Sequence, residues 1–250
     1  MEVGQKITWF LRNPEFLESL LLSISEGERG DFLRSVGTYL LGGFQTMASM
    51  DDLGKAIIIY KRCLELKGDK HPNYEEILSN LGVALQWWFE RTGSMEDLNC
   101  TLQKKEQAIE STSVDHPNFA MYFNNLGSAL QRQFERTGSI EDLDRAIEKK
   151  EESVQSYTVS PSIKLQSAQS CSDILIQHGR YTHPYFILEV AVQLLPRVSL
   201  RHLHRSDRQF SICRFANIPS RAVFLSLKNA RNPYESLQLL ELGRWILATM

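Results

Sequence analysis

The feature that most constrains the fold is a near-duplicate of eleven residues. The stretch WFERTGSMEDL begins at Trp88 and QFERTGSIEDL begins at Gln133, so the two copies lie 45 positions apart (133 − 88). Catalytic motifs rarely occur as tandem duplicates, whereas repeated structural units do. Internal similarity at a period of about 20–50 residues is typical of stacked repeats rather than of a single globular core. The duplication therefore predicts a chain built from successive copies of one small unit.

The same shift of 45 residues aligns segments outside the duplicated stretch. The sequence NLG at 80–82 aligns with NLG at 125–127, and HPN at 71–73 aligns with HPN at 116–118. Toward both ends of the chain the copies are weaker, although one small residue still recurs at each period. These small residues are Ala56, Thr101, Ala146, Ala191 and Ser236. We interpret them as positions where helices pack closely.

Each unit is predicted to form two helices, because apolar residues recur at steps of three and four. In the unit after residue 73 the first helix is predicted from Leu78, Leu81, Leu85 and Trp88 or Phe89. Its second helix is predicted from Met95, Leu98, Leu102 and Ile109. Glycines recur inside the first helices at Gly37, Gly82 and Gly127, where they predict a close crossing with a neighbouring helix.

The duplicated motif itself is predicted to be the turn between the two helices. Gly93 suits the left-handed residue that ends a helix, and Ser94 can cap the next helix with Asp97 completing a capping box. The second copy repeats these roles with Gly138, Ser139 and Asp142.

The 45-residue alignment also places a proline before the first helix of each of the two best-matched units. Pro72 and Pro117 are expected in the first turn of the next helix, where a missing N–H is harmless. His71 and His116, which precede them, are expected to have a structural role in that turn.

Composition and charge narrow the functional classes. Hydrophobic residues make up 42% of the chain and charged residues 23%, as in ordinary folded proteins. The four cysteines lie 37 or more residues apart, which favours reduced thiols, and we find neither a secretory signal nor an apolar run of about 18–20 residues. We therefore expect a cytoplasmic protein without a membrane partner.

Positive charge is concentrated near the C-terminus. Residues 196–231 carry eight Lys or Arg and one acid, giving +7, while the rest carries 20 basic and 29 acidic residues, giving −9. Such a segment could bind nucleic acid or an acidic partner, or it could dock against the acidic remainder of the chain or against a neighbouring domain outside this sequence. Docking is favoured over nucleic acid, because no recognition motif or aromatic platform accompanies the charge.

No sequence motif predicts catalysis, a cofactor or a metal site. Phosphate-binding loops, dinucleotide fingerprints and hydrolase elbows do not occur in the sequence. Cys171, His178 and His183 come nearest to a constellation, but a Cys/His dyad depends on tertiary geometry. Cys63 and Cys171 are expected to be packing residues.

These features resemble the tetratricopeptide repeat (TPR). That family has a Leu-Gly pair in the first helix and small residues in the second, as at 81–82 with Ala108 and at 126–127 with Ala146. The resemblance implies an all-α, right-handed superhelical solenoid, here with a period of 45 residues instead of the usual 34. The implied organisation is an incomplete helical segment at 1–27, TPR-like repeats at 28–205 and a terminal helical hairpin at 206–250.

A narrower resemblance concerns the repeat arms that precede a CHAT domain, which has a caspase-like fold. It rests on the FERTGS-EDL units followed by AVQLLPRVSL, HRSDRQ and NPYESLQLLELGR. It implies a CHAT domain, covalently linked or separate, as a possible partner.

A helical-repeat protein can hold a peptide on the concave surface formed by its first helices. The residues expected to line that surface are Ser79, Val83, Gln86, Asn124, Ser128, Gln131 and Arg132, with Arg34 and Gln169 at the equivalent positions of flanking units. These positions are equally consistent with simple solvent exposure. The sequence thus predicts a non-enzymatic scaffold for protein–protein interaction, with the regulatory arm of a CHAT effector as the alternative.

The last helix is predicted to begin at Pro233. Its inward stripe is expected to comprise Leu237, Leu240 and Leu247. Leu239, Leu242 and Ile246 form a second apolar stripe, with Trp245 beside it. Because a terminal repeat has no neighbour over its outer face, this helix is expected to expose an apolar patch.

Overall fold

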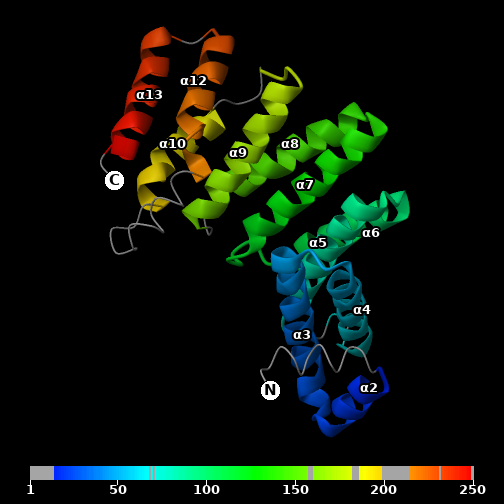
Figure 1. Cartoon of the computed structure of the whole chain (residues 1–250). Helices are drawn as coiled ribbons and strands as arrows, with labels where there is room; N and C mark the ends of the chain where they lie inside the picture. The colour runs from blue at the N-terminus through cyan, green and yellow to red at the C-terminus, as the bar shows by residue number, and fades with distance from the viewer. Residues whose placement is uncertain are drawn as a thin grey trace. The chain divides into compact units, whose positions relative to one another are not determined.

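The computed structural model describes residues 14–67, 69, 71–156, 160–181, 186–198, 214–230 and 232–248, without the side chains of 14–18, 67, 186, 198 and 246–248. These residues form helices joined by turns, with no strand among them (Figure 1). The chain divides into two compact units, Met1–Thr112 and Ser113–Met250. The division predicted from the sequence, at residues 27 and 205, stays a prediction.

The first unit consists of helical hairpins around one apolar core. Its helices are α2 (Pro14–Ser23), α3 (Glu26–Met47), α4 (Met50–Lys67), α5 (Tyr74–Thr92) and α6 (Met95–Glu110). Helix α3 packs on α4, α4 on α5 and α5 on α6, so each helix contacts its neighbours in sequence. The core is built from α3, α4 and α5, with fully buried side chains such as Leu33, Leu53 and Ile77.

The second unit continues the pattern and ends in a further hairpin. Its helices are α7 (Phe119–Thr137), α8 (Ile140–Gln155), α9 (Pro161–Gln177), α10 (Phe186–Val198), α12 (Ile218–Lys228) and α13 (Pro233–Ala248). Helix α7 packs on α8, α8 on α9 and α9 on α10, while α12 pairs with α13. The core joins α8, α9, α10 and α12 through residues such as Leu165, Ile174 and Val192.

The hairpins α5–α6 and α7–α8 are copies of one unit. Helix α7 begins 45 residues after α5 (119 − 74), and α8 begins 45 residues after α6 (140 − 95). The predicted all-α architecture of helix-turn-helix units is therefore confirmed. A 45-residue period along the whole chain remains a prediction. Below, α3, α5, α7 and α9 are called first helices, and α4, α6 and α8 second helices.

The duplicated motif is the predicted turn, with one correction. Gly93 and Gly138 end α5 and α7 in the left-handed region, with φ of 75° and 71°. The hydroxyl of Ser94 accepts from the backbone N–H of Asp97 at 3.3 Å. The backbone N–H of Ser94, however, donates to Thr92 Oγ1 at 3.5 Å. The capping box was predicted with the aspartate in that second role, but the preceding threonine supplies the acceptor instead.

The prolines lie outside the helices they precede, which corrects a second prediction. Helices α5 and α7 begin two residues after Pro72 and Pro117. The prolines instead belong to turns closed by the preceding histidines. In the first of these, the backbone N–H of Asn73 donates to His71 Nδ1 at 3.0 Å, and the N–H of Tyr74 donates to the His71 carbonyl at 3.1 Å. His116 makes the same side-chain contact, at 3.1 Å, so the predicted structural role of both histidines is confirmed.

The small residues predicted at helix crossings are buried. The five that recur at 45-residue spacing, Ala56, Thr101, Ala146, Ala191 and Ser236, are all at most 1% exposed. Cys63 and Ser153 lie at another such position, and each donates a hydrogen bond across a hairpin. The Cys63 thiol donates to the Gly30 carbonyl at 3.2 Å, and the Ser153 hydroxyl donates to the Ala120 carbonyl at 2.7 Å.

Two predictions about buried faces were wrong. Met95, expected on the inner stripe of α6, is 39% exposed, because the buried side of that helix runs through Leu98, Thr101 and Lys105. In α13, Leu237 was expected to face inward but is exposed, and the side chain of Leu247 lies outside the described residues. The inner face of α13 instead contains Ser236, Gly243 and Leu239, although Leu239 was predicted on the second, outer stripe with Leu242.

Candidate functional site

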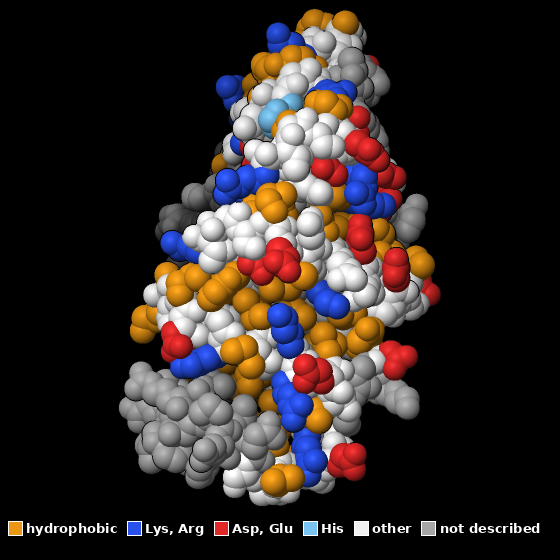
Figure 2. Space-filling model, turned by 90° about the vertical axis from the view of Figure 1, so that its right-hand side faces the viewer, with side chains coloured by type: hydrophobic (Ala, Val, Ile, Leu, Met, Phe, Trp, Pro, Cys, Tyr) orange, Lys and Arg blue, Asp and Glu red, His pale blue; other side chains and the backbone are white. Residues whose placement is uncertain are grey.

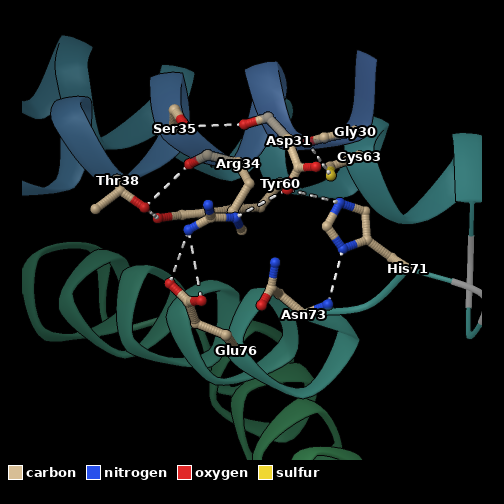
Figure 3. A network of polar contacts seen from close by, with 10 residues as sticks. All are labelled: Gly30, Asp31, Arg34, Ser35, Thr38, Tyr60, Cys63, His71, Asn73 and Glu76. Atoms are coloured by element: carbon tan, nitrogen blue, oxygen red, sulfur yellow. Dashed lines mark hydrogen bonds and ion pairs between the residues drawn. The ribbon is translucent and has the colours of Figure 1, made fainter. Parts of the chain in front are cut away.

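The first-helix face of the first unit begins with Arg34, which is held by carboxylates. Its guanidinium Nη1 lies 3.3 Å and 3.5 Å from the two carboxylate oxygens of Glu76 on α5, and Nε lies 3.7 Å from Asp31 (Figure 3). The Asp31 carboxylate also lies 3.8 Å from His71 Nε2. Arg34 therefore joins α3 to α5 and carries a charge that is already neutralised on two sides.

Beneath Arg34 the network in Figure 3 continues into the core. The hydroxyls of Thr38 and Tyr60 lie 3.2 Å apart, linking α3 to α4. Burial raises the pKa of Tyr60 to about 12, so its phenol stays neutral and hydrogen-bonded. This cluster links α3 to α4 within the first unit.

The other predicted residues of this unit differ in accessibility. Ser79 is only 2% exposed, so it contributes almost no surface. Val83 is half-buried and packs against the core, and its remaining surface is apolar. Gln86 is half-buried as well. Its amide oxygen accepts from the Lys105 ammonium, while its amide nitrogen donates to Glu90 Oε1 at 3.1 Å.

In the second unit, α7 brings four of the predicted residues onto one side of a single helix. Ser128 Oγ donates to the Asn124 carbonyl at 3.0 Å. Further along, Gln131 donates to Glu135 at 3.1 Å, and Arg132 pairs with the same carboxylate at 2.7 Å. The guanidinium-bearing side chain of Arg132 is 44% exposed, which leaves it accessible to a ligand.

Asn124 is the exception among these residues, because its side-chain oxygen Oδ1 has no hydrogen-bond partner among the described residues. It is 8% exposed, and its Oδ1 atom is buried and unsatisfied. A carboxamide can accept and donate at once. Leaving a buried polar atom unpaired costs about 1–3 kcal/mol, so the unpaired Oδ1 of Asn124 needs a physical explanation.

Gln169 is engaged by a later helix. Its amide nitrogen donates to Asn217 at 3.3 Å, and its carbonyl accepts from Arg221 at 3.2 Å. Arg221 on α12 also pairs with Asp173 of α9 at 2.5 Å. Gln169 is thus part of the contact between α9 and α12. The Arg221 pair also supports the prediction that the basic segment docks against acidic residues of the chain, although residues 199–213 lie outside the described part.

Two lysines are buried, which was not predicted from the sequence. Lys105 and Lys150 are 2% and 0% exposed, and each crosses a first-helix glycine closely. A Cβ at Gly82 would lie 2.8 Å from Lys105 Cγ, and one at Gly127 would lie 2.8 Å from Lys150 Cγ. The predicted close crossings are therefore confirmed, with lysine stems as the crossing groups. The available signal was their position, 23 residues after each glycine (105 − 82 and 150 − 127).

The ammonium of Lys150, on the second helix α8, contacts the first helix α7. It donates to Ser128 Oγ at 2.9 Å, and burial lowers the pKa of Lys150 from 10.5 to about 8. Nearby, burial raises the pKa of the Cys171 thiol to about 12, far from the value of a reactive thiolate. The predicted packing role of Cys171 follows from this burial. His178 stacks edge-on against Phe134 at 4.8 Å, and His183 lies outside the described residues.

A shallow cleft of about 290 Å³ lies at the other end of the α7–α8 hairpin. Phe119 and Phe123, with ring centroids 4.8 Å apart, line it together with Val114. Lys149 lies 5.5 Å from the Phe123 ring centroid and 3.0 Å from Glu152 at the rim. The cleft contains none of the residues predicted from the sequence.

The described residues form neither a metal-ligand cluster nor a membrane-spanning helix. No three His, Cys, Asp or Glu side chains among them gather as metal ligands would. No described helix combines the length and apolarity that a membrane span requires. On the face drawn in Figure 2, hydrophobic side chains are interspersed with Lys, Arg, Asp and Glu.

Comparisons with known proteins identify the fold. A family model for the tetratricopeptide repeat matches residues 119–155, which contain α7 and α8. The putative kinesin light chain TPR-like repeats of Podosopora anserina superpose with a TM-score of 0.55 at 18% identity, covering 88% of this chain and 97% of that one. The fold is that of a TPR-like helical repeat.

A second solved structure supports the same fold. BtubC (BKLC) from P. vanneervenii gives a TM-score of 0.56 at 17% identity, covering 100% of this chain and 92% of that one. A search of the curated proteins found no match. The TPR-like fold predicted from the sequence is confirmed.

Proposed function

We propose that this chain is a non-enzymatic scaffold whose first helices bind an extended segment of a partner protein. TPR-like repeats generally act as protein-interaction scaffolds, and stacked helical repeats present first-helix surfaces to their ligands. The nine residues predicted from the sequence remain the proposed lining of the first-helix surfaces, four of them in the first unit and five, from Asn124 to Gln169, in the second. Among them, Ser79 and Gln169 have supporting roles, because Ser79 is buried and Gln169 contacts α12.

The observation that carries the proposal is the unpaired carboxamide of Asn124. Its position on α7 lies one turn before Ser128 and two turns before Arg132, so all three share one side of the helix. An extended peptide offers backbone N–H and C=O groups that a carboxamide can satisfy together. Ligand binding would thereby remove the cost of a buried, unsatisfied oxygen.

The proposed partner segment carries a carboxylate. Arg132 supplies an accessible guanidinium on the same side of α7 as Asn124, and the Lys150 ammonium lies behind Ser128. Both groups favour negative charge in a ligand. An aspartate or glutamate near the residue that contacts Asn124 is therefore the expected feature of the bound sequence.

Selection from a random displayed-peptide library tests this proposal. Peptides enriched on the wild-type protein should bind Asn124→Ala at least tenfold more weakly, because truncation removes both amide contacts. The matched control is Asn99→Ala, which removes an exposed carboxamide from the second helix α6 and should bind as the wild type does. Arg132→Glu should weaken capture further for acidic sequences, with helicity unchanged by circular dichroism.

Equal binding by Asn124→Ala and Asn99→Ala would place the ligand elsewhere on the molecule. If Arg132→Glu bound every selected peptide at wild-type strength, the proposed carboxylate would be wrong while the peptide surface itself would stand.

A second proposal rests on sequence motifs. The units ERTGS-EDL and the segment NPYESLQLLELGR resemble repeat arms that precede a CHAT domain, and such an arm would regulate a protease-like effector. Sequencing the transcript beyond residue 250 tests it: a frame encoding an α/β domain with His and Cys supports the arm, and a stop codon favours the scaffold alone. The proposed location of either form is the cytoplasm, which the dispersed cysteines support.

A further inference from the structure

We propose that the outer face of α13 is an interface between two copies of this chain. This face, called the α13 face, comprises Tyr234, Leu237, Leu242 and Trp245, which are 65%, 51%, 37% and 63% exposed. At 100° per residue these four positions lie within one side of the helix. The interface is independent of the proposed peptide-binding surface on α7.

Close packing on the opposite side of α13 fixes this face outward. A Cβ at Gly243 would clash with Pro219 Cγ, so the backbone of α13 rests directly on α12. Ser236 Oγ lies 2.9 Å from Ser226 Oγ, and Leu239 packs against the core of the second unit. Rotation of α13 to bury Trp245 would break all three contacts. The helix therefore directs these four side chains away from the described core of the second unit.

The concentration of apolar surface on α13 is unusual for this protein. Single exposed hydrophobic residues are normal on a protein surface, but a cluster indicates a contact surface. An aromatic side chain buries about 150–250 Å² when covered, so Tyr234 and Trp245 alone leave roughly 200–300 Å² of ring surface in water. Each copy in a standard interface contributes about 800 Å². The α13 face with its rim is smaller, which predicts a reversible dimer with a dissociation constant on the order of micromolar or weaker.

The α13 face carries one acidic and one basic side chain, so it can pair with the same face of a second copy. Glu241 and Arg244 have highly exposed side chains and pair with each other at 3.2 Å. A two-fold interface must be self-complementary, because the same patch supplies both sides. If two α13 helices pack antiparallel about an axis between these residues, Glu241 of one copy faces Arg244 of the other, and the contact forms twice. The patch thus carries both charges needed for its own pairing.

Sedimentation velocity on the full chain, from about 1 to 200 µM, tests the interface. The wild type should shift from monomer to dimer over this range. Leu237→Glu should weaken association at least tenfold, because it places an unpaired charge in the apolar contact. Ile58→Glu is the matched control: Ile58 is 66% exposed on α4, and this variant should dimerise as the wild type does. Circular dichroism verifies that each variant folds.

A charge exchange tests the antiparallel arrangement. Glu241→Arg should weaken the dimer several-fold, because four arginines then meet at the axis. Adding Arg244→Glu to that variant restores opposite charges and should recover wild-type association. Failure to recover would overturn the antiparallel pairing. The interface would be overturned if the wild-type chain remained monomeric at 200 µM, or if Ile58→Glu weakened association as much as Leu237→Glu. A monomer whose α13 face bound a separate CHAT-type domain would overturn it as well.

Discussion

At the scale of single residues, the unusual groups are the lysines that cross the first-helix glycines. Tyr60, Lys105 and Lys150 lie 45 residues apart, and each covers a glycine of the preceding helix. Tyrosine suits that position, because its ring fills the crossing and its hydroxyl reaches Thr38. Lysine fills the crossing with its methylene stem, but it must also bring an ammonium out of water. Lys150 Nζ donates a hydrogen bond to the neutral hydroxyl of Ser128, and burial disfavours its charged form.

This environment gives Lys150 a pH-dependent effect on stability. Because the folded pKa of about 8 lies below the ordinary value of 10.5, the folded protein binds fewer protons than the unfolded chain between those pH values. Through this group, the free energy of unfolding rises as the pH increases from about 8 to 10.5. Lys150→Met removes the effect while keeping most of the buried stem. The variant should gain up to about 3 kcal/mol relative to wild type at pH 7, and most of that gain should disappear by pH 10.

Urea unfolding of both proteins at pH 7 and pH 10 measures this difference. The control is Lys149→Met, whose ammonium lies 3.0 Å from Glu152 in a partly exposed ion pair. Its stability relative to wild type should change by less than about 1 kcal/mol between the two pH values. An equal pH response in the two variants would show that burial of Lys150 is not the cause.

At the scale of helices and turns, periodic features were predictable from the sequence, and contacts between helices were less so. Gly93 and Gly138 were assigned correctly because a left-handed helix end strongly favours glycine. The outward orientation of Leu237 was missed, because apolar spacing alone could not distinguish the two sides of α13. The close approach of Gly243 to Pro219 decides that orientation, and it depends on tertiary packing. Lys150 was missed because a helical lysine is normally solvated.

For the candidate surface too, positions set by helical spacing were predictable, whereas contacts between helices were not. The repeat alignment brought Asn124, Ser128 and Arg132 onto one side of α7 correctly, since helical spacing determines which residues share a side. It did not predict that Ser79 is buried or that Gln169 contacts α12, because both depend on how neighbouring helices pack. The unpaired amide of Asn124 also has no sequence signal.

The helix register can be tested at Ala146, which is 0% exposed and whose carbonyl lies 3.0 Å from the Cβ position of Gly127. Ala146→Trp should lower the free energy of unfolding by at least about 1–3 kcal/mol, because the crossing has no room for an indole. Thermal unfolding followed by circular dichroism measures the loss. Glu148→Trp adds the same ring to an exposed position of α8 and should have little effect. Unchanged unfolding of Ala146→Trp would contradict the register of this hairpin.

At the scale of the whole molecule, the TPR-like fold assigns different tasks to different surfaces. Small residues and lysine stems hold each hairpin together, so the second helices contribute mainly to packing. The polar side of α7 contains Asn124, whose buried amide oxygen is unpaired among the described residues, and α13 exposes an apolar face with paired charges. The first surface is proposed to bind an extended peptide and the second to bind another copy of the chain. A dimer would then carry two peptide-binding surfaces, so that binding of a bivalent partner would be strengthened.

Photo-crosslinking of a selected peptide tests the central claim most directly. A library-selected peptide carrying one benzophenone group is irradiated on the 250-residue chain, and the attachment sites are mapped by mass spectrometry. Crosslinks should concentrate on the first helix α7 around Asn124, Ser128 and Arg132, and they should decrease in Asn124→Ala. Crosslinks concentrated on the exposed side of α8, at residues such as Asp144 and Glu148, would contradict the account.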